Sequence, residues 1–518
     1  MKKILSILAI LAGVGAFAQN SRPSDDHQLT LEAAAQQFDA SNNAAGMGLS
    51  QPSSGSKTEL KGFYEAGDFH PVQQGDSDLG FRFSTLRYDS FSDKLFMKGS
   101  FYYSFDREAG RPWSDVRDPW FSIPFIYGSS VAKNYDTHDC GLSFDLYTAP
   151  LADWISVGVR SSYRVSDISG MRDPRPRTGY LDYQLVPSVL LSFGRHSLGF
   201  DAGYGYSKEK LSGLSTIQSY PNLYYYKMSG LDHVDGAIAA YSGFKRQFAG
   251  SRVLGDLSYG YGGETVKLMV SGGMEYGKLN AYGDKMQSPG SYNYFTYNGV
   301  ADLLLYGENL LHRLHFKGQY KDAGADEYLQ ELESVKDPET GATTETWVTL
   351  YEYTNRYMLK TVEAGLDYTL YGACSGSDYG WSAGVEALWS DFRKDCYLPH
   401  SEFGASGLTL ELGGSVLLLN SHNHKLELAA NAGGRIHVNC FQNLQYDNLY
   451  TQEVLVKDLS YYSSDYVSAN ASLTWTFPLN LGKAGWANGY LKLCGGTLSA
   501  RPSASLSKVS LSVGLFTF

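Results

Sequence analysis

The stretch Gly407–Asn439 reads GLTLELGGSVLLLNSHNHKLELAANAGGRIHVN, and it carries the pattern that decides the fold. In its first half, apolar side chains stand at alternate positions from Leu408 onward, with Thr409 and Glu411 among the polar residues between them. The polar turn Ser421–His424 follows, and the second half alternates in the same way. A period of two is that of a β-strand, whose successive side chains point to opposite faces. The stretch therefore predicts an antiparallel hairpin with one apolar and one charged face.

Three further segments, Trp154–Val165, His312–Tyr320 and Met358–Tyr371, show the same alternation. A dry sandwich would bury the apolar faces, but the charged faces would still need water. A transmembrane β-barrel turns the apolar faces to lipid and the charged faces to an aqueous lumen, so we predict an all-β, antiparallel transmembrane barrel. The residues that we expect to face its lumen are Arg160, Arg164, Arg313, His315, Lys317, Glu363, Asp367, Glu411, Glu427 and Arg435.

Short and long connections alternate along the chain. The predicted short turns are Ser92-Asp93, Ala149–Asp153, Gly194–His196, Gly262-Gly263, Gly307–Asn309, Cys374–Asp378, Ser421–His424 and Asn480–Gly482. The predicted long loops are Asp106–Asn134, Ser166–Gly179, Ser207–Gly250, Asp322–Thr349, Lys394–Ser406 and Gln442–Ser464. Short periplasmic turns and long extracellular loops are typical of bacterial outer-membrane barrels. This spacing predicts about 18 strands, with 16 as the alternative.

The two ends of the chain fit this interpretation. Lys2 and Lys3 precede an apolar run and a small-residue site at Ala16–Ala18, so residues 1–18 are expected to be a secretory signal peptide. Residues 19–57 are polar, with a helix expected over Leu29–Ala40, and we expect them to lie in the periplasm or to rest in the lumen. Residues 58–518 are expected to form the barrel. Its closing strand is expected at Lys508–Phe518, where apolar and polar residues again alternate.

Composition agrees with a large β-protein, because 56 glycines supply turns and bends and 40 tyrosines suit boundaries between water and apolar surroundings. The formal net charge of −11 argues against a nucleic-acid partner. None of the five cysteines falls in a CxxC pattern, and a pair between Cys396 and Cys440 is left open. We expect no cofactor and no metal site.

The tripeptide Arg-Asp-Pro occurs twice, at Arg117–Pro119 and Arg172–Pro174, in predicted outer loops. Guanidinium groups bind carboxylate or phosphate through paired hydrogen bonds, and proline stiffens the loop that presents them. One interpretation is an anion or lipopolysaccharide site near the mouth; the alternative is that Arg–Asp pairs hold the loops together. The candidate residues are Arg111, Trp113, Arg117, Trp120, Arg172, Arg175 and Arg177.

The stretch Arg172–Tyr183, RDPRPRTGYLDY, and the strands after it resemble a family of outer-membrane β-barrels of unknown function from the Bacteroidota. The resemblance implies an outer-membrane location and a barrel over most of the mature chain, and it brings no activity or site residues. Locally, Asn43–Gly46 resembles the Asn-Pro-Ala-Gly turn of fatty-acid-transporter-like barrels, with Ala44 in place of the proline.

A barrel of 16–18 strands leaves an aqueous channel unless it is plugged. We therefore expect a channel or uptake pore for small polar or amphipathic solutes, in contact with outer-membrane lipid and lipopolysaccharide. Two alternatives remain open: a structural barrel that docks a periplasmic or surface subunit, and an outer-membrane hydrolase. No P-loop, dinucleotide-binding or HExxH motif occurs, so we expect the protein not to be an enzyme.

Overall fold

A computed structural model describes residues 25–517 apart from 51–53, 121–122, 216–223, 239–243, 337–338, 340–342, 375–377, 422–423 and 482–485. The expected signal peptide lies outside the described residues. Among the described helices, none combines the length and the apolar character that a membrane-crossing helix needs.

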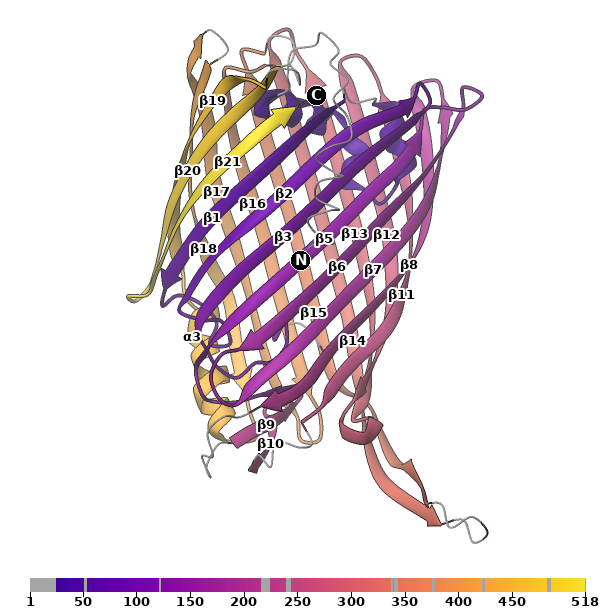
Figure 1. Cartoon of the computed structure of the whole chain (residues 1–518), viewed down its shortest axis with the longest axis vertical. Helices are drawn as coiled ribbons and strands as arrows, with labels where there is room; N and C mark the ends of the chain where they lie inside the picture. The colour runs from indigo at the N-terminus through magenta and orange to yellow at the C-terminus, as the bar shows by residue number, and fades with distance from the viewer. Residues whose placement is uncertain are drawn as a thin grey trace.

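Eighteen of the described strands form one antiparallel sheet that closes on itself (Figure 1). Each strand pairs with its neighbours along the chain, and β1 pairs with β21 to complete the barrel. The predicted barrel of 18 strands is therefore confirmed. Its strands are β1 (Gly55–Gly67), β2 (Ser77–Ser92), β3 (Leu95–Arg111), β5 (Lys133–Thr148), β6 (Ile155–Gly170), β7 (Arg175–Phe193), β8 (His196–Ser215), β11 (Arg246–Gly262), β12 (Val266–Tyr282), β13 (Gly290–Tyr306), β14 (Leu310–Lys336), β15 (Thr343–Gly372), β16 (Trp381–Cys396), β17 (Ser401–Ser421), β18 (His424–Asn443), β19 (Tyr466–Asn480), β20 (Trp486–Ala500) and β21 (Ser505–Thr517).

The eight predicted short turns lie at or between the ends of successive strands at one end of the barrel, which we call the turn end; residues 375–377, 422–423 and 482 of these turns lie outside the described part of the chain. At the opposite end, the loop end, three predicted loops are largely strand. β6 and β7 leave only residues 171–174 between them, and β16 and β17 leave only 397–400. β14 and β15 continue to Lys336 and from Thr343 as a hairpin that projects beyond the barrel (Figure 1). Charged and polar residues interrupt the apolar positions in these extensions, so the regular alternation that marks a strand in the sequence is lost.

Large apolar side chains cover the outside of the barrel wall. On β17, for example, Leu410, Leu412 and Val416 are exposed, with 66% of Leu412 accessible. On β14 the outward side chains include Leu314 and Phe316. An isolated soluble protein rarely exposes a continuous apolar surface of this extent, so the outer wall is suited to contact hydrocarbon.

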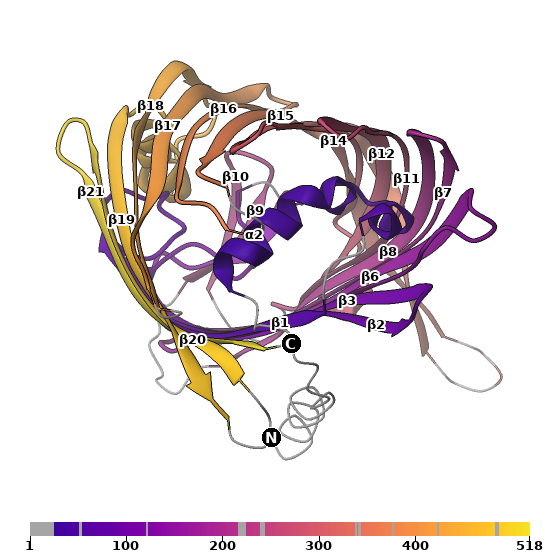
Figure 2. The same cartoon turned by 90° about the horizontal axis from the view of Figure 1, so that it is seen from above.

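The N-terminal segment lies inside the barrel at the turn end (Figures 1 and 2). It consists of helix α2 (Asp26–Ala35) and two short 3-10 helices, η1 (Gln37–Ala40) and η2 (Ala44–Leu49). The helix begins three residues before its predicted start at Leu29 and ends before Gln36, where the backbone leaves the helical conformation.

The second half of this segment is anchored in a small apolar core. Phe38 and Met47 are buried against Tyr147 and Leu190 on the inner wall. At the start of η2 the Asn43 side chain accepts a hydrogen bond of 3.1 Å from the Gly46 N–H, which caps the turn. Residues 37–49 are therefore a packed part of the lumen wall.

The long connections at the loop end fold over the lumen. β4 (Phe125–Gly128), β9 (Tyr224–Ser229) and β10 (His233–Ile238) form a three-stranded sheet, and η4 (Thr451–Leu455) leads into helix α3 (Val456–Tyr462). Their apolar side chains join those of the wall strands in one buried cluster. From the connections it includes Trp113, Phe125, Met228 and Val454, and from the wall it includes Phe248, Tyr292, Tyr357, Phe392 and Phe403.

Close contact between Gly158 and the N-terminal segment gives a test of its docking. A Cβ atom at Gly158 would lie 2.5 Å from the backbone N of Ala45, whereas one at Gly99 would meet nothing within 4 Å. Overpacking of this kind costs about 1–3 kcal/mol. We expect Gly158→Val to speed amide hydrogen exchange in residues 37–49 without unfolding the barrel, and Gly99→Val to leave it unchanged. Unaltered exchange in Gly158→Val would mean that the segment is not packed on β6.

Candidate functional site: a lumen closed at both ends

Ion pairs hold the start of α2 between distant strands of the wall. Asp26 pairs with Lys57 of β1 at 2.6 Å, and Asp25 pairs with Lys425 of β18 at 2.6 Å. The helix thus bridges the part of the wall that runs from β18 through β21 to β1, and it forms a floor to the lumen at the turn end (Figure 2).

His27 is buried in this floor between two acidic groups. Its Nδ1 lies 3.1 Å from Asp378 and its Nε2 lies 3.4 Å from Glu427, while its ring stacks on Tyr379 at 4.1 Å. Burial opposes the charged form, but the hydrogen bonds with Asp378 and Glu427 outweigh it and raise the pKa of His27 to about 9. Burial alone would raise the pKa of Asp378. The hydrogen bonds with His27 and Lys425 outweigh this effect and lower the pKa to about 2. His27 and Asp378, which we call the latch, are therefore both charged at neutral pH.

The rest of the segment is held by polar contacts as well as by its apolar core. Arg160, one of the predicted lumen residues, donates to the backbone oxygen of Ser41 and to Asp145 at 2.8 Å, and lies 3.4 Å from Asp39. Lys98 pairs with Asp39 at 2.6 Å. Two of these three partners, Ser41 and Asp39, come from the segment itself, so the wall charges of Arg160 and Lys98 anchor it.

At the loop end, a buried charge network fastens the infolded connections to the wall. The Arg246 guanidinium, on β11, lies 3.2 Å from Asp115 and 2.9 Å from Glu209, and its side chain is 2% exposed. The Tyr225 hydroxyl of β9 donates to Asp115 at 3.0 Å. We call the infolded connections 112–132, 224–238 and 444–465 the roof. Nothing in the sequence signalled this network, because its members are far apart along the chain.

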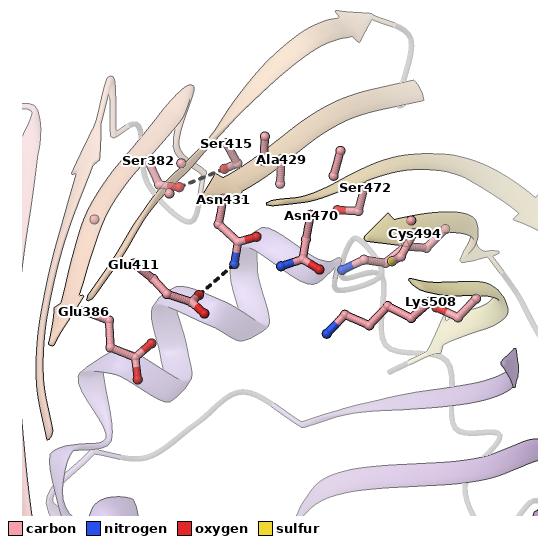
Figure 3. A pocket seen from close by; sticks show the side chains of 18 of the residues that line it. Ser382, Glu386, Glu411, Ser415, Ala429, Asn431, Asn470, Ser472, Cys494 and Lys508 are labelled. Atoms are coloured by element: carbon pink, nitrogen blue, oxygen red, sulfur yellow. Dashed lines mark hydrogen bonds between the residues drawn. The ribbon is translucent and has the colours of Figure 1, made fainter. Parts of the chain in front are cut away.

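A cavity of about 640 Å³ lies directly above the floor, and we call it the turn-end cavity. One side carries Asp367, Glu386 and Glu411, which are register partners on β15, β16 and β17. Asn431 lies beside them and donates to Glu411 at 3.1 Å. Figure 3 shows Glu386 and Glu411 projecting into this space from adjacent strands. Three carboxylates thus stand in one row across the wall.

Lysines line the other side of the same cavity. Lys61 comes from β1, Lys492 from β20 and Lys508 from β21. One carboxylate, Glu65 of β1, stands among them as the register partner of Lys508, so this side carries three positive charges and one negative charge. Figure 3 shows Lys508 pointing into the space that Glu386 and Glu411 enter from the opposite side. Among the described residues, no carboxylate lies within ion-pair distance of these three lysines. The cavity therefore has an acidic side and a basic side that do not neutralise each other by contact.

A second cavity of about 510 Å³, the loop-end cavity, continues along the same wall. On β15, Glu363 lines the loop-end cavity and Asp367 lines the turn-end cavity; four strand residues span about 13 Å. Trp120 and Tyr462 from the roof cover the loop-end cavity. Arg435, another predicted lumen residue, also lines it and donates to the carbonyl oxygens of residues 461, 462 and 464. The two cavities are separate and follow one another along the same part of the wall, one beneath the roof and one towards the floor, and charged side chains line both.

The remaining predicted lumen residues are mostly engaged with neighbours on the wall. Arg164 donates to Asp139 at 2.9 Å, and Arg313 and His315 lie 2.8 and 3.3 Å from Asp302. Lys317 follows two residues after His315 on β14.

The predicted anion-site residues are not brought together in one place. Arg111 is buried beside Glu108, and the Trp113 indole donates to Glu453 at 2.8 Å within the roof. Arg175 and Arg177 lie on β7 instead of in a loop, where they pair with Asp173 at 2.8 Å and Asp167 at 2.6 Å.

Three members of the set lie elsewhere. Arg117 stacks on Tyr180 at 4.7 Å, Trp120 lines the loop-end cavity, and Arg172 is exposed. Arg175 and Arg177 each pair with an aspartate, as expected if Arg–Asp pairs hold this part of the chain together. An anion site at these residues stays a prediction.

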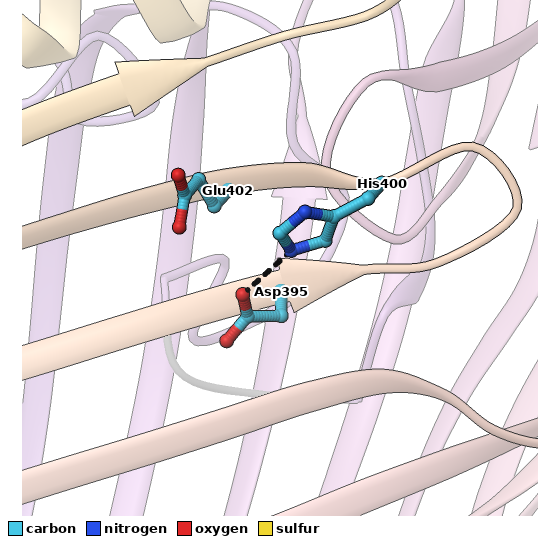
Figure 4. Close-up of side chains that lie close together, drawn as sticks. All are labelled: Asp395, His400 and Glu402. Carbon is cyan, nitrogen blue, oxygen red and sulfur yellow. Dashed lines mark hydrogen bonds and ion pairs between the residues drawn. The ribbon is translucent and has the colours of Figure 1, made fainter.

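Asp395, His400 and Glu402 cluster at the β16–β17 connection (Figure 4). His400 lies 3.1 Å from Asp395, and the Arg393 guanidinium donates to Asp395 at 2.9 Å and to Glu402 at 3.0 Å. A cation would have to displace this guanidinium, so the cluster is an ion-pair network of the barrel rim. The five cysteines are unpaired, Cys396 and Cys440 among them.

Fold and interior together define the class: a closed 18-stranded antiparallel β-barrel whose lumen is occupied at both ends by its own chain. The chain belongs to the family of unknown function DUF6850, which matches residues 44–517. No curated protein matches the sequence significantly.

Solved structures with similar folds include the ferric citrate transporter FecA in its unliganded form, at 9% identity and TM-score 0.40 over 89% of this chain and 78% of that one. BauA, the ferric preacinetobactin receptor from Acinetobacter baumannii, matches at 10% identity and TM-score 0.39 over 89% and 80%. The CymD monoaromatic hydrocarbon channel matches at 10% identity and TM-score 0.30 over 93% and 94%. At these values the similarities do not bear on function.

The roof network predicts that substitution of Arg246 destabilises the roof much more than substitution of Arg177. Arg246→Met leaves Asp115 and Glu209 without their buried cation, and loss of one partner of a buried pair costs about 3–5 kcal/mol. Arg177→Met removes an exposed pair worth at most about 1 kcal/mol. We expect limited proteolysis of the purified protein to cut residues 112–132 in Arg246→Met, and not in Arg177→Met. Equal resistance in both variants would contradict a roof held by this network.

The raised pKa of His27 predicts that the floor loosens in alkaline solution. A group whose pKa is raised on docking stabilises the docked state fully below its free pKa of 6.5, and the stabilisation is lost as pH rises through about 9. Hydrogen exchange in residues 26–35 should therefore accelerate between about pH 7 and pH 9.5 beyond its intrinsic increase. His27→Gln should exchange fast already at pH 7 and lose the excess pH dependence, whereas His400→Gln should behave as wild type. An excess pH dependence that persists in His27→Gln would rule out this latch.

Proposed function

We propose that the protein is an outer-membrane channel for the uptake of small polar solutes, with its turn end in the periplasm and with α2 as its gate. The single observation that carries the proposal is the succession of two cavities, each lined by charged side chains, along β15–β18 between the roof and the floor. The apolar outer wall supports the membrane location, because lipid-facing side chains of such barrels are apolar and lumen-facing ones are polar.

The two ends of this succession of cavities support a gate at the floor. At the loop end, the cavities are covered by connections with a continuous apolar core and a buried charge network. At the turn end, α2 itself buries little apolar surface: His27 and Ala34 are its only buried residues. The floor has no apolar core comparable to that of the roof, and apolar burial is the main stabilising contribution to packing, so we take the floor as the closure that opens at lower cost.

Partner docking is a second candidate function, and one observation favours it. The projecting hairpin of β14 and β15 exposes Leu329, Val335, Leu350 and Tyr351 beyond the barrel. A two-stranded ribbon is marginally stable by itself, and its edges carry unpaired backbone groups. A subunit that adds a strand to this ribbon would stabilise it.

Planar-bilayer conductance tests the channel and its gate together. Wild-type protein should show small or rare openings. The double substitution His27→Gln/Lys425→Gln removes four ion pairs of the floor and should raise the mean conductance at least several-fold.

Arg393→Gln/His400→Gln is the matched control, because it removes ion pairs at the rim of the loop end and should leave conductance unchanged. Absence of conductance in both the wild type and the floor variant, with the protein inserted and folded, would reject the channel and favour a docking barrel.

A further inference from the structure

We propose that the turn-end cavity binds zwitterionic solutes whose ammonium and carboxylate groups lie several bonds apart, with short peptides as the chemical class. This inference rests on the proposed function only for its role in uptake; the binding itself follows from the cavity. Its volume of about 640 Å³ lies within the range of small-molecule sites, roughly 300–1,000 Å³.

The acidic side supplies a place for an ammonium group. Like charges on directly opposed strand positions destabilise a sheet, so the row of Asp367, Glu386 and Glu411 is unfavourable in the empty barrel. Asn431 donates to Glu411, and Thr369 donates to Asp367 at 3.1 Å. Glu386 has a carboxylate on either side and forms no ion pair with any described residue. A cationic group at Glu386 would relieve this repulsion.

The basic side supplies a place for a carboxylate. Lys61 and Lys492 stand on either side of Ser512, their common register position on β21. Lys508 lies further along β21 and points into the cavity (Figure 3). A lysine ammonium is a compact charge with three donors, which suits a carboxylate that arrives in different orientations.

The spacing of the two sides selects the size of the ligand. Glu411 on β17 and Lys508 on β21 are four strands apart, which is about 19 Å along the wall. Both side chains reach inward and shorten the gap between their charges (Figure 3). An extended peptide of three residues spans about 10–11 Å between its ends. A free amino acid, with both charges on one carbon, cannot contact both sides at once.

The test uses the full-length protein in detergent and four probes of nearly equal size. They are triglycine, a zwitterion; triglycinamide, a cation; N-acetyltriglycine, an anion; and N-acetyltriglycinamide, which is neutral. Titration calorimetry should give a Kd for triglycine at least tenfold below that of each other probe. Glu386→Gln should weaken triglycine and triglycinamide but not N-acetyltriglycine. Lys508→Gln should weaken triglycine and N-acetyltriglycine but not triglycinamide.

Arg393→Gln, at the rim and outside both cavities, should bind all four probes as wild type does. The proposal is overturned if the four probes bind equally or not at all, or if Glu386→Gln and Lys508→Gln leave their order unchanged. Because Glu386→Gln and Lys508→Gln are independent, the proposal stays testable if one of the two variants misfolds. Entry of N-acetyltriglycinamide into proteoliposomes reports the channel separately. Entry without selective binding would contradict the proposed peptide site but not the channel. Selective binding without entry would contradict the channel but not the peptide site.

Discussion

Pairing of β1 with β21 is the interaction on which the rest of this structure depends. It satisfies the backbone groups of the two strands that would otherwise be edges, and a sheet without edges is what a membrane can accept. Closure also turns every second side chain of eighteen strands toward one shared interior. Each lumen contact described above, from the floor at His27 to the roof at Arg246, exists because distant strands face one another across that interior.

A barrel of this size is too wide for its own wall side chains to fill, so it leaves a channel unless other parts of the chain close its ends, as they do here. The two closures use opposite chemistry. The roof is an apolar core fastened by a fully buried ion network, in which removal of one partner leaves a costly unpaired charge. The floor is a helix with two buried residues, His27 and Ala34, held by ion pairs at its first turn and by the packing of Leu31 on a small wall cluster. The proposed gate rests on this difference between the two ends.

The sequence was sufficient for the barrel because its determinants are local. Alternation over ten residues and the polar turns between alternating segments are visible within one hairpin, as in Gly407–Asn439, and repeat along the chain. The alternation does not mark the strands where β14 and β15 continue past the apolar outer wall, because both of their faces then meet water. It also fails for β4, β9 and β10, which are short and depend on packing inside a lumen that exists only after closure.

The site was only partly predictable for a related reason. Lumen-facing charges such as Glu411 and Arg160 could be assigned to the polar face of a strand, but their partners could not. Arg160 meets Asp39 across 121 residues, and His27 meets Asp378 across 351. The wall charges that matter for the cavities are those without such partners. In the described structure they fall into an acidic group on β15–β17 and a basic group on β20, β21 and β1.

Separation of these two groups is itself a consequence of closure. Lys61 lies near one end of the sequence and Lys508 near the other, and only the β1–β21 seam makes them neighbours. Two strands, β18 and β19, separate the acidic group from the nearest lysine, Lys492 of β20, so the opposite charges do not form ion pairs across the space. The cavity therefore keeps carboxylates on one side and mostly lysines on the other. A solute with a single charge is attracted to one side and repelled by the other, whereas a solute with both charges gains at both sides.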